Sequence, residues 1–244
     1  MMKSHFPSRR ALIFSLVVLV VAMLVQLPAS LLALVFPSHI QLQNVEGSFW
    51  NGKASAFGIS GVIVQEQVAW QLLPKALLEA QLLWDIKGRL SDKNSQLIMG
   101  LNFNGALLNN VNVVLPLEPL ALLHPQLKPL QLGGTVNVSA KTIGMNMRWD
   151  AVVTIEHLFS QLTPQDEFGN FRANLRTEPD GKGNWQVTTI AGSNLRVTGN
   201  GTFDIRQNRG EGQVTLIPPP QMQGLSLALS TLPKVGEGYQ FKFE

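Results

Sequence analysis

The side chains that could carry acid–base or nucleophilic chemistry are few and widely separated in this 244-residue sequence. Among the four histidines, only His157 has a carboxylate directly beside it, that of Glu156. The sequence contains no H-E-x-x-H, no G-x-S-x-G and no phosphate-binding glycine loop, the motifs that bring such groups together. The other histidines and the aspartates stand singly: His5, His39, His124, Asp85, Asp92, Asp150, Asp166, Asp180 and Asp204. We therefore predict no catalytic, metal-binding or cofactor-binding residues, and we expect that the protein is not an enzyme.

Composition narrows the chemistry further. The chain has no cysteine, which excludes disulfides, thiolate metal sites and cysteine nucleophiles. Only 14% of its residues are charged and the net charge is +3, and no stretch forms the basic stripe typical of nucleic-acid binding. A hydrolase whose serine, histidine and carboxylate meet only in three dimensions remains an alternative.

One long apolar run near the N-terminus organises the rest of the chain. Residues 11–36 carry no charge and are long enough for a transmembrane helix, which needs about 20 residues. The predicted membrane-anchor residues are the large apolar side chains of its first part: Leu12, Ile13, Phe14, Leu16, Val17, Val18, Leu19, Val20, Val21, Leu24 and Val25.

Basic residues precede this run and predict its orientation. Lys3, Arg9 and Arg10 favour a cytoplasmic N-terminus. A cleaved signal peptide is the alternative, but Leu27-Pro28-Ala29 has leucine where a cleavage site prefers a small residue. We expect a basic head at 1–10, a retained single-pass anchor at 11–36 and an exported domain at 37–244. In a Gram-negative cell the anchor would lie in the inner membrane and the domain in the periplasm.

Beyond the run, short segments alternate apolar and polar residues, which is the pattern of half-buried strands. Leu97 to Phe103 is one example and Met145 to Ile155 is another. About a dozen such segments joined by short turns predict a mainly β fold, a curved antiparallel sheet that is either a half-pipe or sandwich-like. The pair Asn51-Gly52 predicts a tight turn, and Pro74 to Leu78 predicts a short helical turn.

A weak internal similarity raises the alternative that the exported domain contains two related halves instead of a single unit. Gly47-Ser48-Phe49-Trp50 resembles Gly201-Thr202-Phe203-Asp204. The halves would meet near residues 125–134.

The stretch from Val45 to Leu78 carries the most specific pattern. It contains V-E-G-S-F-W-N-G-K-A and then V-A-W-Q-L-L-P-K-A-L-L, which matches W-x-L-x-P-x-x-L-L. Together with the basic head and single anchor, this pattern resembles type II secretion system protein N, the general secretion pathway N component of Gram-negative bacteria. The motif residues are Gly47, Trp50, Gly52, Trp70, Leu72, Pro74, Leu77 and Leu78.

The resemblance implies an accessory inner-membrane component of the machine that exports folded proteins across the outer membrane. Its partners would be other inner-membrane or periplasmic secretion-system proteins. The alternative is an AsmA-like envelope protein, a family whose curved sheets offer an apolar groove to lipid. From the residues alone, we expect Trp50 and Trp70 to pack in the core, since a large aromatic on the apolar face of a strand buries much surface.

Overall fold

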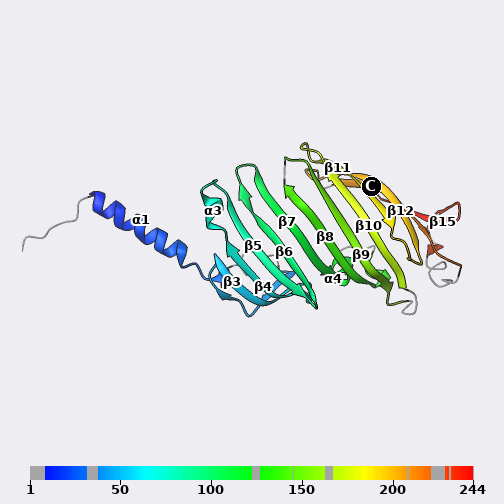
Figure 1. The fold of residues 1–244 in the computed structure, drawn as a ribbon, viewed down its shortest axis with the longest axis horizontal. Helices are drawn as coiled ribbons and strands as arrows, with labels where there is room; N and C mark the ends of the chain where they lie inside the picture. Colours follow the sequence, from blue (N-terminus) through cyan, green and yellow to red (C-terminus); the bar gives the residue numbers. More distant parts are fainter. Residues whose placement is uncertain are drawn as a thin grey trace, which may run out of the picture.

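The computed structural model describes residues 9–31, 38–122, 127–144, 146–162, 167–207, 209–220, 229–230 and 232–243. Within these ranges the chain forms one 15-stranded antiparallel sheet and a few helices, so the mainly β prediction is confirmed (Figure 1). The strands are β1 (Ile40–Gln43), β2 (Glu46–Gly47), β3 (Asn51–Ile59), β4 (Val62–Leu72), β5 (Leu82–Leu90), β6 (Lys93–Asn102), β7 (Gly105–Pro116), β8 (Leu132–Gly144), β9 (Trp149–Ser160), β10 (Glu167–Thr177), β11 (Lys182–Thr189), β12 (Arg196–Asp204), β13 (Arg209–Ile217), β14 (Lys234–Val235) and β15 (Gly238–Phe243). The helices are α1 (Arg9–Val25), η1 (Ala29–Leu31), α3 (Pro74–Leu77), α4 (Leu117–Leu122) and η2 (Lys128–Leu130).

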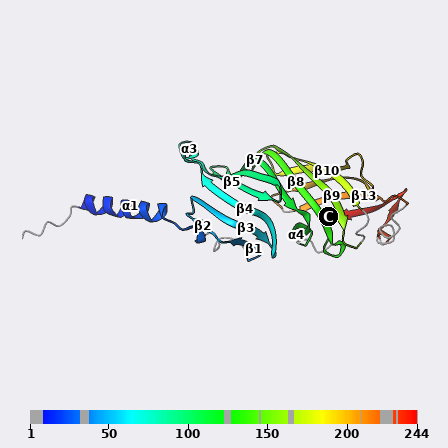
Figure 2. The same cartoon turned by 60° about the horizontal axis from the view of Figure 1, so that its bottom comes forward.

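Strands that follow one another in sequence lie side by side in the sheet. The order is β1-β3-β4-β5-β6-β7-β8-β9-β10-β11-β12-β13-β15-β14, and β2 pairs with β3 next to β1. Every described strand joins this one sheet, which is open and curved (Figure 2). Of the two predicted shapes, an open curved sheet agrees with the half-pipe, because a sandwich needs two sheets packed face to face.

Helix α1 ends earlier than predicted, at Val25 instead of Phe36. Pro28 has no N–H, and its ring would clash with the carbonyl of Leu24 in a continued helix. The chain turns instead, and Pro28 forms an isolated bridge with Ser48. The prediction of one helix over residues 11–36 is therefore wrong, and residues 32–37 lie outside the described ranges. Among the described residues, no helix combines the length and the apolar character needed to cross a membrane.

The connections between strands agree with most of the predicted turns. Helix α3 begins at Pro74, as predicted, and its first position tolerates proline because that N–H has no helical partner. One predicted strand begins too early: β9 starts at Trp149 and not at Met145, which itself lies outside the described ranges. Asn146 takes a left-handed conformation with φ of 61°, so residues 146–148 belong to the connection between β8 and β9.

Buried apolar residues form separate clusters along the sheet. The N-terminal half has one cluster around Val68 and Trp70 and another around Leu83 and Leu107, the latter covered by α3 through Ala76. The C-terminal half has a cluster of Phe168, Phe171, Leu195 and Val197. Strands β7 and β8 pair directly, so the sheet runs without a break past residues 125–134. The relation between two halves stays a prediction.

Glycines allow aromatic rings to lie flat across neighbouring strands. Trp185 on β11 pairs with Gly201 on β12, which in turn pairs with Gly212 on β13. A Cβ added at Gly212 would lie 2.4 Å from the Trp185 ring. The ring therefore occupies the space that side chains on the next two strands would take, which is a recurrent role of glycine inside strands.

We predict that Gly212→Val lowers the free energy of unfolding by about 1–3 kcal/mol, because the new side chain must displace the Trp185 ring. Gly210→Val is the matched control on the same strand, since a Cβ there meets no atom closer than 3.6 Å. Chemical denaturation of the full chain measures both variants. Equal destabilisation by the two variants would show that the ring contact does not determine the cost.

Candidate functional site

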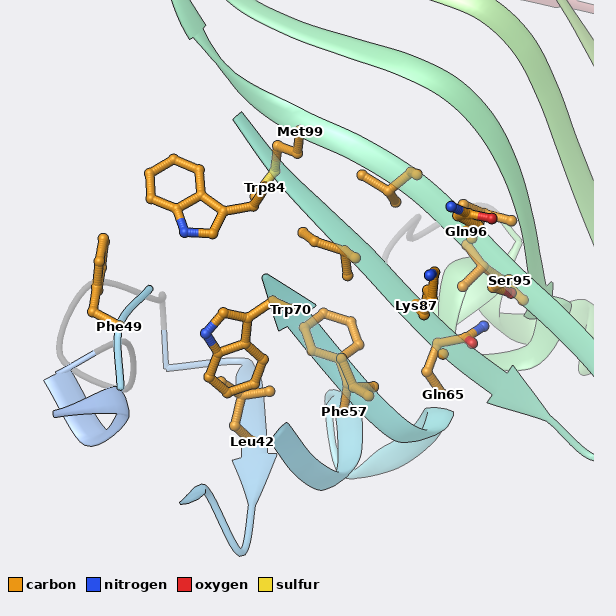
Figure 3. Close-up of a pocket in the computed structure, with 16 residues that line it drawn as sticks. Leu42, Phe49, Phe57, Gln65, Trp70, Trp84, Lys87, Ser95, Gln96 and Met99 are labelled. Carbon is orange, nitrogen blue, oxygen red and sulfur yellow. The ribbon is translucent and has the colours of Figure 1, made fainter. Parts of the chain in front are cut away.

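A pocket of about 340 Å³ lies on one face of the N-terminal half of the sheet (Figure 3). Figure 3 shows Trp84 and Met99 on one side of it, Leu42 and Phe57 on the other, and Phe49 at one end. Binding pockets for small molecules typically measure roughly 300–1,000 Å³. The pocket is therefore large enough for a ligand, and its walls are almost entirely hydrocarbon.

Two irregularities in the strands create this pocket. Gln67 on β4 has φ of 50°, and the register of β4 against β5 shifts between Glu66 and Ala69. Such a bulge adds one residue to the strand and reverses which side chains share a face. As a result, Gln65 lines the pocket together with Val68 and Trp70.

The second irregularity ends the backbone hydrogen-bond ladder between β6 and β7. Asn110 on β7 has φ of 49°, and the ladder between the two strands ends at the pair of Gln96 with Asn112. Beyond that pair, Val113 and Leu115 line the pocket. The apolar lining therefore continues from β6 onto β7.

Buried side chains satisfy the backbone where the β6–β7 ladder ends. The Val114 N–H donates to Ser95 Oγ over 2.9 Å. The Val114 carbonyl accepts from Ser95 Oγ and from Gln65 Nε2. Gln65 is only 7% exposed, and its Oε1 has no hydrogen-bond partner. This oxygen is enclosed by protein atoms and is not exposed to the pocket.

The side chains of Lys87 and Gln96 lie on the opposite face of the sheet, because this pair is adjacent to the pocket-lining pair of Ile86 with Leu97 and successive side chains of a strand point to opposite faces. Both pair there with Asp85. Gln96 Nε2 donates to Asp85 Oδ1 over 2.9 Å, and Lys87 Nζ lies 3.1 Å from Asp85 Oδ2. Figure 3 places Gln65, Lys87, Ser95 and Gln96 opposite the aromatic end. The pocket can hold an apolar molecule, and its lining offers such a molecule almost no polar group.

His157, the histidine with an adjacent carboxylate in the sequence, lies on β9 and does not line this pocket. His157 Nδ1 lies 2.8 Å from Glu167 Oε1 on the exposed surface of β9 and β10. His5 and His124 fall outside the described ranges, within which no three histidine, aspartate or glutamate side chains could hold a metal ion. Elsewhere on the sheet, a hydrogen bond to Asp150 raises the pKa of Arg176 above its ordinary value.

Of the motif residues of the N-terminal stretch, Trp70 lines the pocket, and Asn51-Gly52 is not the predicted turn. Both residues belong to β3, and the turn instead spans residues 48–50 after Gly47, whose φ is 90°. Gly52 pairs with Trp70, and a Cβ at Gly52 would lie 2.4 Å from the Trp70 ring. The glycine is needed for close approach of the ring, which sequence alone does not distinguish from a turn signal.

Trp70 is a core residue, as predicted, whereas Trp50 is not. Trp70 is 6% exposed, but Trp50 is only partly buried. Its Nε1–H donates to the Leu24 carbonyl in the last turn of α1 over 2.7 Å, and the Phe49 N–H donates to the Leu27 carbonyl over 2.8 Å. Trp50 therefore caps the end of α1, whose last carbonyls have no helical partner.

Three aromatic rings join the end of α1 to the pocket. Trp50 stacks on Trp84 with ring centroids 6.2 Å apart, and Phe49 meets both rings edge-on at 5.1 and 5.6 Å. We call Phe49, Trp50 and Trp84 the aromatic cluster. Because Phe49 and Trp84 also line the pocket, the cluster forms a continuous apolar surface between helix and pocket.

The remaining motif and anchor residues lie on the surface around this end of the sheet. The Leu72 N–H donates to the Trp50 carbonyl over 2.6 Å, Pro74 opens α3, and Leu77 and Leu78 are exposed. The exposed predicted anchor residues on α1 are Ile13, Phe14, Leu16, Val17, Val18, Leu19, Val20, Val21, Leu24 and Val25. The roles of Gln65 and Ser95 are not predictable from the sequence, because neither a β-bulge nor the end of a hydrogen-bond ladder has a characteristic local sequence pattern.

The fold and pocket together define a mainly β protein with one long open sheet, an apolar pocket and an apolar helical arm. The family model described as "Type II secretion system (T2SS), protein N" matches residues 38–243, from β1 to the end of β15. The chain belongs to the type II secretion system protein N family, as the resemblance predicted. Comparison with curated proteins found no match, and comparison with solved structures found none.

We predict that Ser95→Ala lowers the free energy of unfolding by about 1–3 kcal/mol, because it leaves the buried Val114 N–H without an acceptor. Ser139→Ala on β8, at an exposed position, is the control and should change stability by less than about 0.5 kcal/mol. Denaturant titration of both variants tests this. A neutral Ser95→Ala would show that the side chain does not support the end of the β6–β7 ladder.

We also predict that Trp50→Phe loosens the junction between α1 and the sheet, because the ring loses its N–H donor to the Leu24 carbonyl. The expected weakening is about 0.5–1.5 kcal/mol. Hydrogen exchange should become faster at the Phe49 amide, which bonds Leu27. Trp84→Phe, which disturbs the ring stack but not this bond, should leave that rate nearer to wild type. The same acceleration in both variants would contradict the capping role.

Proposed function

We propose that the protein is an accessory component of the type II secretion system, held at the inner membrane with its sheet in the periplasm. It acts there through contacts with other proteins of the system. The observation that carries this proposal is the family match over residues 38–243, which covers every described strand of the sheet.

The N-terminal helix supports the membrane position. From Ile13 to Val25 its large apolar side chains are exposed, and the helix extends away from the sheet (Figure 1). Exposed apolar area of this extent is costly in water and is characteristic of membrane or protein contact. Arg9 and Arg10 at its start favour a cytoplasmic N-terminus. The proposal requires the uncharged run 11–36, which is longer than α1, to cross the membrane and so to place the sheet on the periplasmic side.

Two exposed apolar side chains support a protein contact near the same end of the sheet. Leu78 follows α3 and is 90% exposed, and Phe103 lies in the β6–β7 turn and is 89% exposed. Because consecutive strands are antiparallel, the start of β3, the end of β6 and the start of β7 lie at the same end of the sheet. The chain enters the sheet from α1 at this end, where Pro28 pairs with Ser48. Large apolar residues exposed near one another are typical of interaction sites.

Affinity purification of the tagged full-length protein under mild detergent tests this function. We expect other inner-membrane secretion components to co-purify with the wild type, and Leu78→Asp or Phe103→Asp to reduce their recovery by about tenfold, the effect of ~1.4 kcal/mol. Leu162→Asp is the control, because Leu162 is also exposed but follows β9 at the opposite end of the strands.

Two results would contradict the proposal. Isolation of the wild type without any secretion component would remove the proposed role. Equal loss of partners in Leu162→Asp and Phe103→Asp would remove the proposed contact surface.

A further inference from the structure

The backbone around the pocket has little hydrogen-bonding capacity to offer a ligand. Strands β4 and β5, which supply much of the lining, are paired along both edges, β4 with β3 and β5, and β5 with β4 and β6. In a paired strand the N–H and C=O groups lie in the plane of the sheet and bind the neighbouring strand. A molecule lying on the sheet face therefore meets side chains and not free backbone groups.

The polar side chains beside the pocket are also engaged. Ser95 binds the Val114 backbone, and Gln65 Nε2 donates to the Val114 carbonyl. Gln65 Oε1 is enclosed by protein atoms, and Gln96 and Lys87 pair with Asp85 on the other face of the sheet. A ligand that enters the pocket must therefore rely on apolar contact.

This chemistry discriminates between the two kinds of apolar occupant. A peptide segment would bury several of its own N–H and C=O groups against hydrocarbon, at about 1–3 kcal/mol for each group left without a partner. A hydrocarbon chain has no such groups and gains from every methylene that it buries. The pocket therefore favours a hydrocarbon chain over a peptide.

The position of the pocket supplies a source for that chain. The aromatic cluster lies between the pocket and Leu24, which belongs to the last turn of α1. A chain that leaves a bilayer beside α1 would cross aromatic rings and reach the pocket over an apolar surface. This route depends on the membrane position proposed for α1, whereas the chemistry of the pocket does not.

We propose that the pocket binds one acyl chain of a membrane lipid. The methylene groups of the chain would lie among Trp70, Trp84, Leu97 and Met99. The occupant is a lipid that the sheet withdraws from the membrane surface beside α1. Val113, which lines the pocket on β7, and Asn112, the exposed neighbouring residue on the same strand, provide a matched pair of positions for a test.

The test uses the full-length protein in vesicles of phosphatidylethanolamine and phosphatidylglycerol that contain a photoreactive diazirine analogue of palmitic acid. After irradiation, mass spectrometry maps the labelled residues, so that label on α1 is distinguished from label on β5, β6 and β7. We expect label on the pocket strands of the wild type. Val113→Trp should lower it by about tenfold, because the indole takes the apolar space that the chain would bury. Asn112→Trp should leave it unchanged.

Two labelling results would overturn the proposal: label on α1 alone in the wild type, or equal labelling of the pocket strands in Val113→Trp and Asn112→Trp. A bound peptide in place of lipid, detected by native mass spectrometry, would also overturn it. Circular dichroism confirms that both variants fold. Affinity purification of Val113→Trp, with the amount of co-purified secretion components as the readout, distinguishes failure of this inference from failure of the proposed secretion role. Loss of pocket label with normal recovery of partners supports acyl binding as a separate property, and normal pocket label without any partner overturns the secretion role alone.

Discussion

The hydrogen-bond ladder between consecutive strands is the interaction on which the rest of this structure depends. A single open sheet has no second sheet packed over it, so its backbone groups must be satisfied within the layer. From β3 to β12 each strand pairs with its predecessor and its successor in the chain, and β13 pairs with β12 and β15. Side-chain clusters on the two faces then add stability locally, around Trp70 and Leu83 in one half and around Phe171 in the other.

The functional features occur where that ladder is interrupted. The bulge at Gln67 turns Gln65 toward the apolar face, and the end of the β6–β7 ladder leaves Val114 to be satisfied by Ser95 and Gln65. At the N-terminal edge, Trp50 supplies its ring N–H to α1 instead of packing in the core. In each case a side chain replaces a backbone partner, and the replacement positions the pocket or the helix beside it.

The sequence was sufficient to predict the strands, because the alternation of apolar and polar residues is a local pattern and is present in most of them. It also predicted the short helix at Pro74 and the family, through the pattern around Trp70. It did not predict the pocket, because strict alternation places Val64 with Val68, whereas the bulge places Gln65 there. The pair Asn51-Gly52 predicts a turn from sequence alone, because a positive φ and the close approach of a ring both require glycine. Only the pairing of Gly52 with Trp70 shows that the ring is the reason here.

The sequential strand order has a consequence for how the chain acquires its structure. Almost every pairing joins segments that are adjacent along the polypeptide, so loop closure costs little at each step. Slow folding of β proteins arises mainly from pairings between distant segments. This chain can therefore add one hairpin after another as it is synthesised from its N-terminus, with each completed strand serving as the template for the next.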